Sequence, residues 1–119
     1  MSADRVIEMI GACRFRFASE DDLQRGIKAA LTEAGLDVRR EVRLNARDRI
    51  DLLVGRTGVE VKTGGAPRDV QRQLERYLRS PLIDDLILVT VKAGHARIAQ
   101  GRRPSGKTLT VHVISGSGL

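Results

Sequence analysis

Three charged residues stand inside two runs of residues that otherwise favour buried β-strands, and this pattern constrains the chain more than any other. The runs are 50–54 and 59–62, and the charged residues within them are Asp51, Glu60 and Lys62. Glycines between the runs indicate a turn, so the segment is predicted to form a β-hairpin. Because burying a charge is costly, each of the three needs a partner or a function.

The hairpin register determines whether these charges meet. A four-residue loop from Gly55 to Gly58 places Asp51 opposite Lys62. Side chains alternate between the two faces of a strand, so Glu60 is then expected on the same face. Two neighbouring carboxylates repel each other unless a cation lies between them, and such oxygen-rich sites suit Mg²⁺ or Mn²⁺. The other interpretation is a surface hairpin with a solvated ladder of charges.

The spacing of the charges resembles a known nuclease motif. Asp51, eight further residues and then Glu60-Val61-Lys62 are similar to the PD-(D/E)xK superfamily of nucleases, also called restriction-endonuclease-like. Ile50 replaces the proline that names the motif, at a position that varies widely in the superfamily. The resemblance implies that Asp51 and Glu60 bind a metal ion, that the Val61 carbonyl adds a ligand, and that Lys62 positions the attacking water.

A helix is predicted over residues 19–35, before the hairpin. Its apolar residues recur at helical spacing, Ser19 is suited to cap its N-terminus, and Gly35 ends it. In the branch of the superfamily that contains Holliday-junction resolvases and RecB-type nucleases, a glutamate of the first helix approaches the metal. Glu20 matches it by position, which implies a catalytic role and a place among the metal ligands. Alternatively, Glu20 only complements the helix dipole.

A second helix is predicted after the hairpin, at about residues 68–79. Gln73 and Tyr77 are four residues apart and therefore lie on one face of it. This pair resembles the Q-x-x-x-Y motif of the same branch, which implies that both side chains contact the phosphate backbone or shape the catalytic face. The alternative is that Tyr77, the only tyrosine, is a core aromatic residue.

The composition favours a single domain that binds a polyanion. The chain has 119 residues, of which 41% are hydrophobic, so residues 1–119 are expected to form one domain. The net charge of +6 favours a nucleic acid, and the scarcity of aromatic residues favours the DNA backbone over single-stranded bases. The predicted DNA-binding residues are Arg47, Arg49, Arg72, Arg76, Arg102 and Arg103. The alternative for the helix that carries Arg68, Arg72, Arg76 and Arg79 is a solvated face.

The cysteine content and the hydropathy suggest a cytoplasmic protein. Cys13 is the only cysteine, so neither an intrachain disulfide nor a cysteine zinc cluster is expected. His95 and His112 are too far apart in the sequence to suggest a histidine metal site. No signal peptide is expected, and the longest apolar run, 86–91, is too short to cross a membrane.

The remaining segments complete a predicted α/β fold. Residues 37–44 alternate apolar and charged, as in an outer antiparallel strand, and 86–91 is typical of a central strand buried on both faces. The polar segment 93–107 is expected to be a mobile basic loop, 108–114 a last strand, and 115–118 a frayed tail. The order α-β-β-β-α-β, with this extra C-terminal strand, agrees with a restriction-endonuclease-like mixed sheet flanked by helices.

The resemblance therefore implies a metal-dependent DNA endonuclease that hydrolyses phosphodiester bonds of branched or duplex DNA with Mg²⁺ or Mn²⁺. A catalytically silent DNA-binding protein of the same fold is the alternative, and a structural protein with a chance match is a third interpretation. A homodimer is expected, because two DNA strands need two cuts and one domain carries one site.

Overall fold

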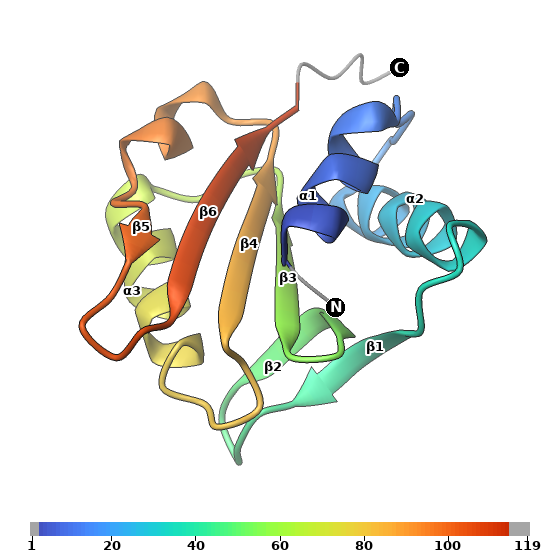
Figure 1. Ribbon diagram of the computed structural model, residues 1–119. Helices are drawn as coiled ribbons and strands as arrows, with labels where there is room; N and C mark the ends of the chain where they lie inside the picture. The colour runs from blue at the N-terminus through green and yellow to red at the C-terminus, as the bar shows by residue number, and fades with distance from the viewer. Residues whose placement is uncertain (1–2, 115–119) are drawn as a thin grey trace.

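A mixed six-stranded sheet lies at the centre of the computed structural model, which describes residues 3–114 (Figure 1). The strand order is β1-β2-β3-β4-β6-β5. The strands are β1 (Val38–Arg43), β2 (Arg49–Val54), β3 (Thr57–Lys62), β4 (Asp85–Thr90), β5 (Gly101–Arg102) and β6 (Thr108–Val113). The helices are α1 (Ala3–Ala12), α2 (Glu20–Glu33) and α3 (Pro67–Tyr77), together with the short 3₁₀ helix η1 (Ala93–Arg97).

The fold has three layers, because one pair of helices covers one face of the sheet and a single helix covers the other (Figure 1). In β4, Ile87 and Val89 pack with α1 and α2, whereas Leu86 and Leu88 pack with α3. This strand is buried on both faces and pairs in parallel with β3 and with β6. The predicted central strand and the predicted order of helices and strands, including the extra C-terminal strand, are confirmed.

The predicted four-residue hairpin loop is wrong. Val54 pairs with Thr57, so Gly55 and Arg56 alone form the turn between β2 and β3. Gly55 has φ of 58°, which suits the first position of a tight hairpin turn. Gly58 lies within β3, and a Cβ there would come within 3.0 Å of Ile83 Cδ1. Gly58 therefore serves close packing against the α3 side of the core and not the turn.

The polar segment 93–107 also differs from the prediction of a mobile loop. It contains η1 and β5, and Arg103 Nη2 donates to Glu75 Oε2 of α3 at 2.7 Å. The segment Ala3–Ala12 forms α1. The expected tail at 115–118 lies outside the described residues. None of the helices in residues 3–114 is long and apolar enough to cross a membrane.

Candidate active site

Asp51 lies at the point in β2 where the regular alternation of side chains between the two faces of the sheet is broken. Leu52 packs with α1 and α2, whereas Ile50 packs with α3, although strict alternation would place both on one face. On the neighbouring strand β1, Glu41 lies between the residues that pair with Leu52 and Ile50, and its φ is 53°. A left-handed residue in a strand twists the ladder locally. This irregularity accompanies the turn of the Asp51 side chain toward β3.

Around Asp51, hydrogen bonds to side chains replace the backbone hydrogen bonds of a regular β2–β3 ladder. The Val61 N–H donates to Asp51 Oδ2 at 2.8 Å, and the Asp51 N–H donates to Glu60 Oε1 at 3.2 Å. The Lys62 ammonium lies 3.4 Å from Glu60 Oε2. The three charged residues predicted to share a face do lie together, although the register that brings them there is not the one expected.

Burial and mutual repulsion dominate the electrostatics of this cluster. Glu60 is only 3% exposed, and desolvation followed by the charge of Asp51 raises its pKa to about 8. Desolvation also raises the pKa of Asp51, although the Val61 N–H and the Lys62 charge act against it. Burial and the neighbouring charge of Asp51 therefore favour the protonated form of Glu60.

The donor set fits a hard divalent cation. A dication bound between Asp51 and Glu60 would offset their repulsion, and both supply the oxygen ligands that Mg²⁺ and Mn²⁺ prefer. The N–H and C=O of one strand residue point toward the same neighbouring strand, so the Val61 carbonyl is directed to Asp51 as its N–H is. Within residues 3–114, no cluster of three His, Cys, Asp or Glu side chains forms a ready metal site.

Glu20 lies at the edge of the cluster, at the start of α2. Ser19 caps this helix as predicted, because its Oγ accepts from the Asp22 N–H at 3.1 Å. Glu20 Oε1 accepts from the Thr63 N–H at 2.8 Å, and its charge contributes to the raised pKa of Asp51. The structure therefore joins Glu20 to the residue that follows Lys62, close to the two buried carboxyl groups.

The Gln73 and Tyr77 pair reaches the same site from α3. Gln73 Nε2 donates to the Tyr77 hydroxyl at 2.8 Å. Tyr77 is 3% exposed and packs in the core, yet the charges of Glu60 and Asp51 add to the desolvation that raises its pKa. Gln73 and Lys62 line one pocket of about 330 Å³. Tyr77 is thus both a core residue and a neighbour of the acidic cluster.

Sequence reasoning missed His95, which fixes the loop after Lys62. His95 is buried, with Nδ1 at 2.6 Å from Thr90 Oγ1 and Nε2 at 2.7 Å from the Gly65 carbonyl. The Gly65 carbonyl can only accept, so Nε2–H donates to it, and Nδ1 of the neutral ring accepts from the Thr90 hydroxyl. Because His95 and Gly65 are 30 residues apart, no local sequence signal connects them.

The predicted DNA-binding arginines are divided between two faces. Arg47, Arg72 and Arg76 line one groove beside α3, whereas Arg49 is exposed on β2 outside it. Asp48, which sequence reasoning also missed, holds Arg76 at 3.2 Å and is itself buried. This ion pair connects the turn between β1 and β2 to α3.

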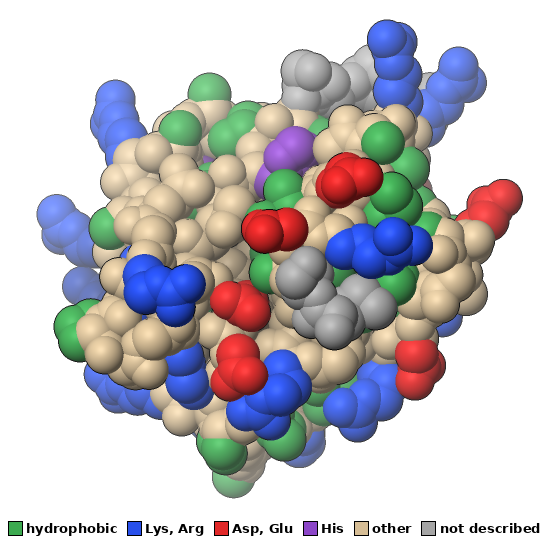
Figure 2. All heavy atoms as spheres, in the orientation of Figure 1, with side chains coloured by type: hydrophobic (Ala, Val, Ile, Leu, Met, Phe, Trp, Pro, Cys, Tyr) green, Lys and Arg blue, Asp and Glu red, His purple; other side chains and the backbone are tan. Residues whose placement is uncertain are grey.

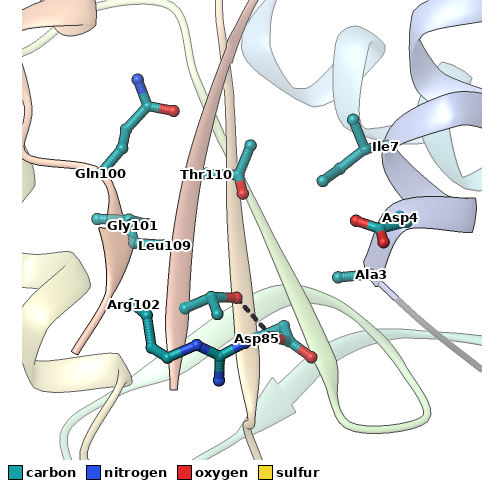
Figure 3. Close-up of a pocket in the computed structure, with 10 residues that line it drawn as sticks. Ala3, Asp4, Ile7, Asp85, Gln100, Gly101, Arg102, Leu109 and Thr110 are labelled. Atoms are coloured by element: carbon teal, nitrogen blue, oxygen red, sulfur yellow. Dashed lines mark hydrogen bonds between the residues drawn. The ribbon is translucent and has the colours of Figure 1, made fainter. Parts of the chain in front are cut away.

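Arg102 and Arg103 point in different directions. Arg103 is bound to Glu75 on the α3 side. Arg102 lies with Asp4 and Asp85 around a pocket of about 580 Å³ between α1, β5 and β6 (Figure 3). Figure 2 shows several acidic side chains near the middle of that face. The structure therefore does not bring Arg102 together with the arginines beside α3.

We expect Glu60→Gln to stabilise the metal-free protein. A raised folded-state pKa means that Glu60 favours folding at low pH and that this contribution is lost as the pH rises from about 4.5 to about 8. Glutamine keeps the acceptor for the Asp51 N–H and removes the charge. The gain in free energy of unfolding at pH 7.5 is on the order of a few kcal/mol, at about 1.4 kcal/mol per pKa unit. Denaturant unfolding in EDTA between pH 5 and 8 measures it.

Glu75→Gln is the matched control for this prediction. Arg103 lowers the pKa of Glu75, so the ionised carboxylate favours folding and its removal is expected to destabilise at neutral pH. The two Glu→Gln changes therefore have opposite signs. A Glu60→Gln protein that is less stable than the wild type at pH 7.5 would contradict the assignment of a repulsive buried pair.

The site is thus a cluster of two buried carboxyl groups and one lysine, with Glu20 and Gln73 at its border. Its elements are β2, β3, α2 and α3, which come from the first two thirds of the chain. Among family models, curated proteins and solved structures, none matches this chain.

Proposed function

We propose that this protein is a metal-dependent DNA endonuclease with a restriction-endonuclease-like core. The observation that carries the proposal is the burial of Asp51 and Glu60 against each other beside Lys62. Burying two carboxyl groups against each other costs several kcal/mol, and the hydrogen bonds that they accept from the Val61 and Asp51 N–H groups only replace those of a regular strand ladder. Buried groups with strongly perturbed pKa values are typical of functional sites, and Lys62 beside them lines a pocket.

In this proposal each residue of the cluster has a different role in phosphodiester hydrolysis. Asp51, Glu60 and the Val61 carbonyl would hold Mg²⁺ or Mn²⁺, with Glu20 in reach of the same edge. When bound, this ion polarises the phosphoryl oxygen and lowers the pKa of a coordinated water. Lys62 orients the attacking water and offsets negative charge on the phosphorus oxygens in the transition state.

Gln73 and Tyr77 have a supporting part in this proposal. The hydrogen bond between them holds the Gln73 amide at the border of the Lys62 pocket. From there the amide is placed to bind a phosphate oxygen of the substrate. The buried Tyr77 ring fixes α3 against the sheet and excludes water from one side of the cluster.

A catalytically silent DNA-binding protein is the second candidate, and a basic groove beside α3 favours it independently of the acidic cluster. Both candidates bind DNA. Only the endonuclease cleaves it, and only when a divalent cation is present.

A cleavage assay on linear, nicked, single-stranded and four-way-junction DNA tests the proposal. Each substrate is incubated with Mg²⁺, with Mn²⁺ and with EDTA. We expect products with either ion and none in EDTA. Intact DNA under every condition, with a folded protein that still binds it, would replace the endonuclease by the silent DNA-binding protein.

A further inference from the structure

A groove lined almost entirely by arginine runs between α3 and the turn that connects β1 to β2. It has a volume of about 640 Å³. We call it the arginine groove, and its lining residues are Arg47, Arg68, Gln71, Arg72, Glu75, Arg76 and Arg79. On α3, Arg68, Arg72 and Arg76 recur at intervals of four residues, which places them along one face of the helix, and Arg79 follows just past its end.

The positive charge of the arginine groove is mostly not neutralised by the protein. In residues 3–114, Arg47, Arg68 and Arg79 form no salt bridge. Arg72 lies 3.9 Å from Asp69, and both side chains are more than 70% exposed, so this pair contributes little. The only acid of the groove, Glu75, is already bound to Arg103.

One of these arginines stands at an unfavourable position for the fold. Arg68 is the second residue of α3, at the positive end of the helix dipole, where acidic side chains are preferred. Its charge therefore opposes helix stability slightly. An exposed arginine at this place is better explained by a ligand of opposite charge than by folding.

The arginine groove is continuous with the candidate active site. Arg76 lines both this groove and the pocket that holds Lys62 and Gln73. Asp48 fixes the Arg76 guanidinium at 3.2 Å, so the junction between the two hollows is rigidly placed. A polyanion bound along the arginine groove would therefore extend into the pocket that holds Lys62.

The lining indicates which part of a nucleic acid it fits. No aromatic side chain lines the groove, and Tyr77 of the same helix is 3% exposed, so bases have no platform on which to stack. From Arg68 to Arg76 a helix rises about 12 Å. The about 3.4 Å that one strand of B-DNA advances per phosphate is measured along the duplex axis, and the winding backbone separates successive phosphates by more than this, so the length spans about two or three phosphates.

We propose that the arginine groove binds the sugar-phosphate backbone of double-stranded DNA over about two or three phosphates on one side of the scissile bond. This inference rests on the proposed endonuclease function for its direction toward Lys62. The inference adds a substrate class to the proposed function, namely a DNA duplex that extends past the cleavage point. It also assigns Arg76 to the phosphate next to the pocket that holds Lys62.

The test is DNA binding in EDTA, where cleavage is not needed. A 20-base-pair duplex of mixed sequence is titrated by fluorescence anisotropy at several salt concentrations, with the Arg68→Ala/Arg79→Ala protein and the wild type. We expect the affinity to fall about 10- to 100-fold near 0.1 M salt and the slope of log K against log salt to lose about two. Arg5→Ala/Arg25→Ala is the control, because it removes the same charge from exposed positions on α1 and α2.

Each outcome bears on one proposal only. An equal loss of slope in both double variants, or none in the groove variant, would overturn the arginine groove as the DNA site even if the wild type cleaves DNA. A specific loss of slope with no cleavage by the wild type would keep the groove and remove the endonuclease. Tighter binding of the single strand than of the duplex would overturn the assignment to double-stranded DNA.

Discussion

Replacing Lys62 with alanine is expected to lower DNA cleavage by about 100-fold or more while the fold and the affinity for DNA stay nearly unchanged. The ammonium lies at the border of the acidic cluster, 3.4 Å from Glu60, where it offsets charge that develops on the phosphate. It is one of 21 basic residues, so its loss changes the overall attraction for DNA little. Single-turnover cleavage in Mn²⁺, with binding measured separately in EDTA, gives both quantities.

Two further variants make this result specific. Lys62→Arg keeps the positive charge but replaces a compact ammonium by a planar guanidinium, so we expect it to restore little activity. Lys28→Ala removes a lysine that lies about 12 Å along α2 from Glu20, and it is expected to cleave like the wild type. Activity of the Lys62→Ala protein within a few-fold of the wild type would show that this lysine has no part in the reaction.

Asp51→Asn is expected to abolish the binding of Mg²⁺ or Mn²⁺ and to leave a protein that is at least as stable without metal. The amide removes one of two buried charges whose repulsion raises the pKa of Glu60. It also removes an anionic ligand that the divalent ion requires. Isothermal calorimetry measures the loss of binding heat, and thermal unfolding in EDTA measures the stability.

Asp84→Asn and Glu20→Gln are the comparison variants for Asp51→Asn. Asp84 is exposed and paired with Arg56 at 2.7 Å, away from the cluster, so its change is expected to leave metal binding intact. Glu20→Gln is expected to weaken binding less than Asp51→Asn, because Glu20 Oε1 is already engaged by Thr63. Equal binding heats for the wild type and the Asp51→Asn protein would refute a metal site at Asp51.

Local sequence determined α2, α3, the central strand and the existence of the hairpin. Ser19 before three acids specifies the start of α2, and Gly35, with φ of 90°, follows its end. The continuous apolar run in β4 indicated burial on both faces. These signals depend on neighbours within a few residues, which is why the sequence alone contains them.

The spacing of Asp51, Glu60 and Lys62 likewise placed the charges in two adjoining strands without the structure. Their contacts depended on packing. Gly58 looks like a turn residue in the sequence, but the approach of Ile83 from another element gives it a place in β3 and shortens the turn. The left-handed Glu41 on a neighbouring strand then accompanies the turn of Asp51 toward Val61.

Only the tertiary structure decided which basic residues gather beside the site. Asp48 and Arg76 are 28 residues apart, yet their ion pair joins the turn after β1 to α3 and closes one side of the arginine groove. Arg102 and Arg103 are adjacent in sequence but lie on opposite faces, because successive side chains alternate along an extended chain. Composition therefore determined that the protein is basic, and long-range packing determined where that charge is concentrated.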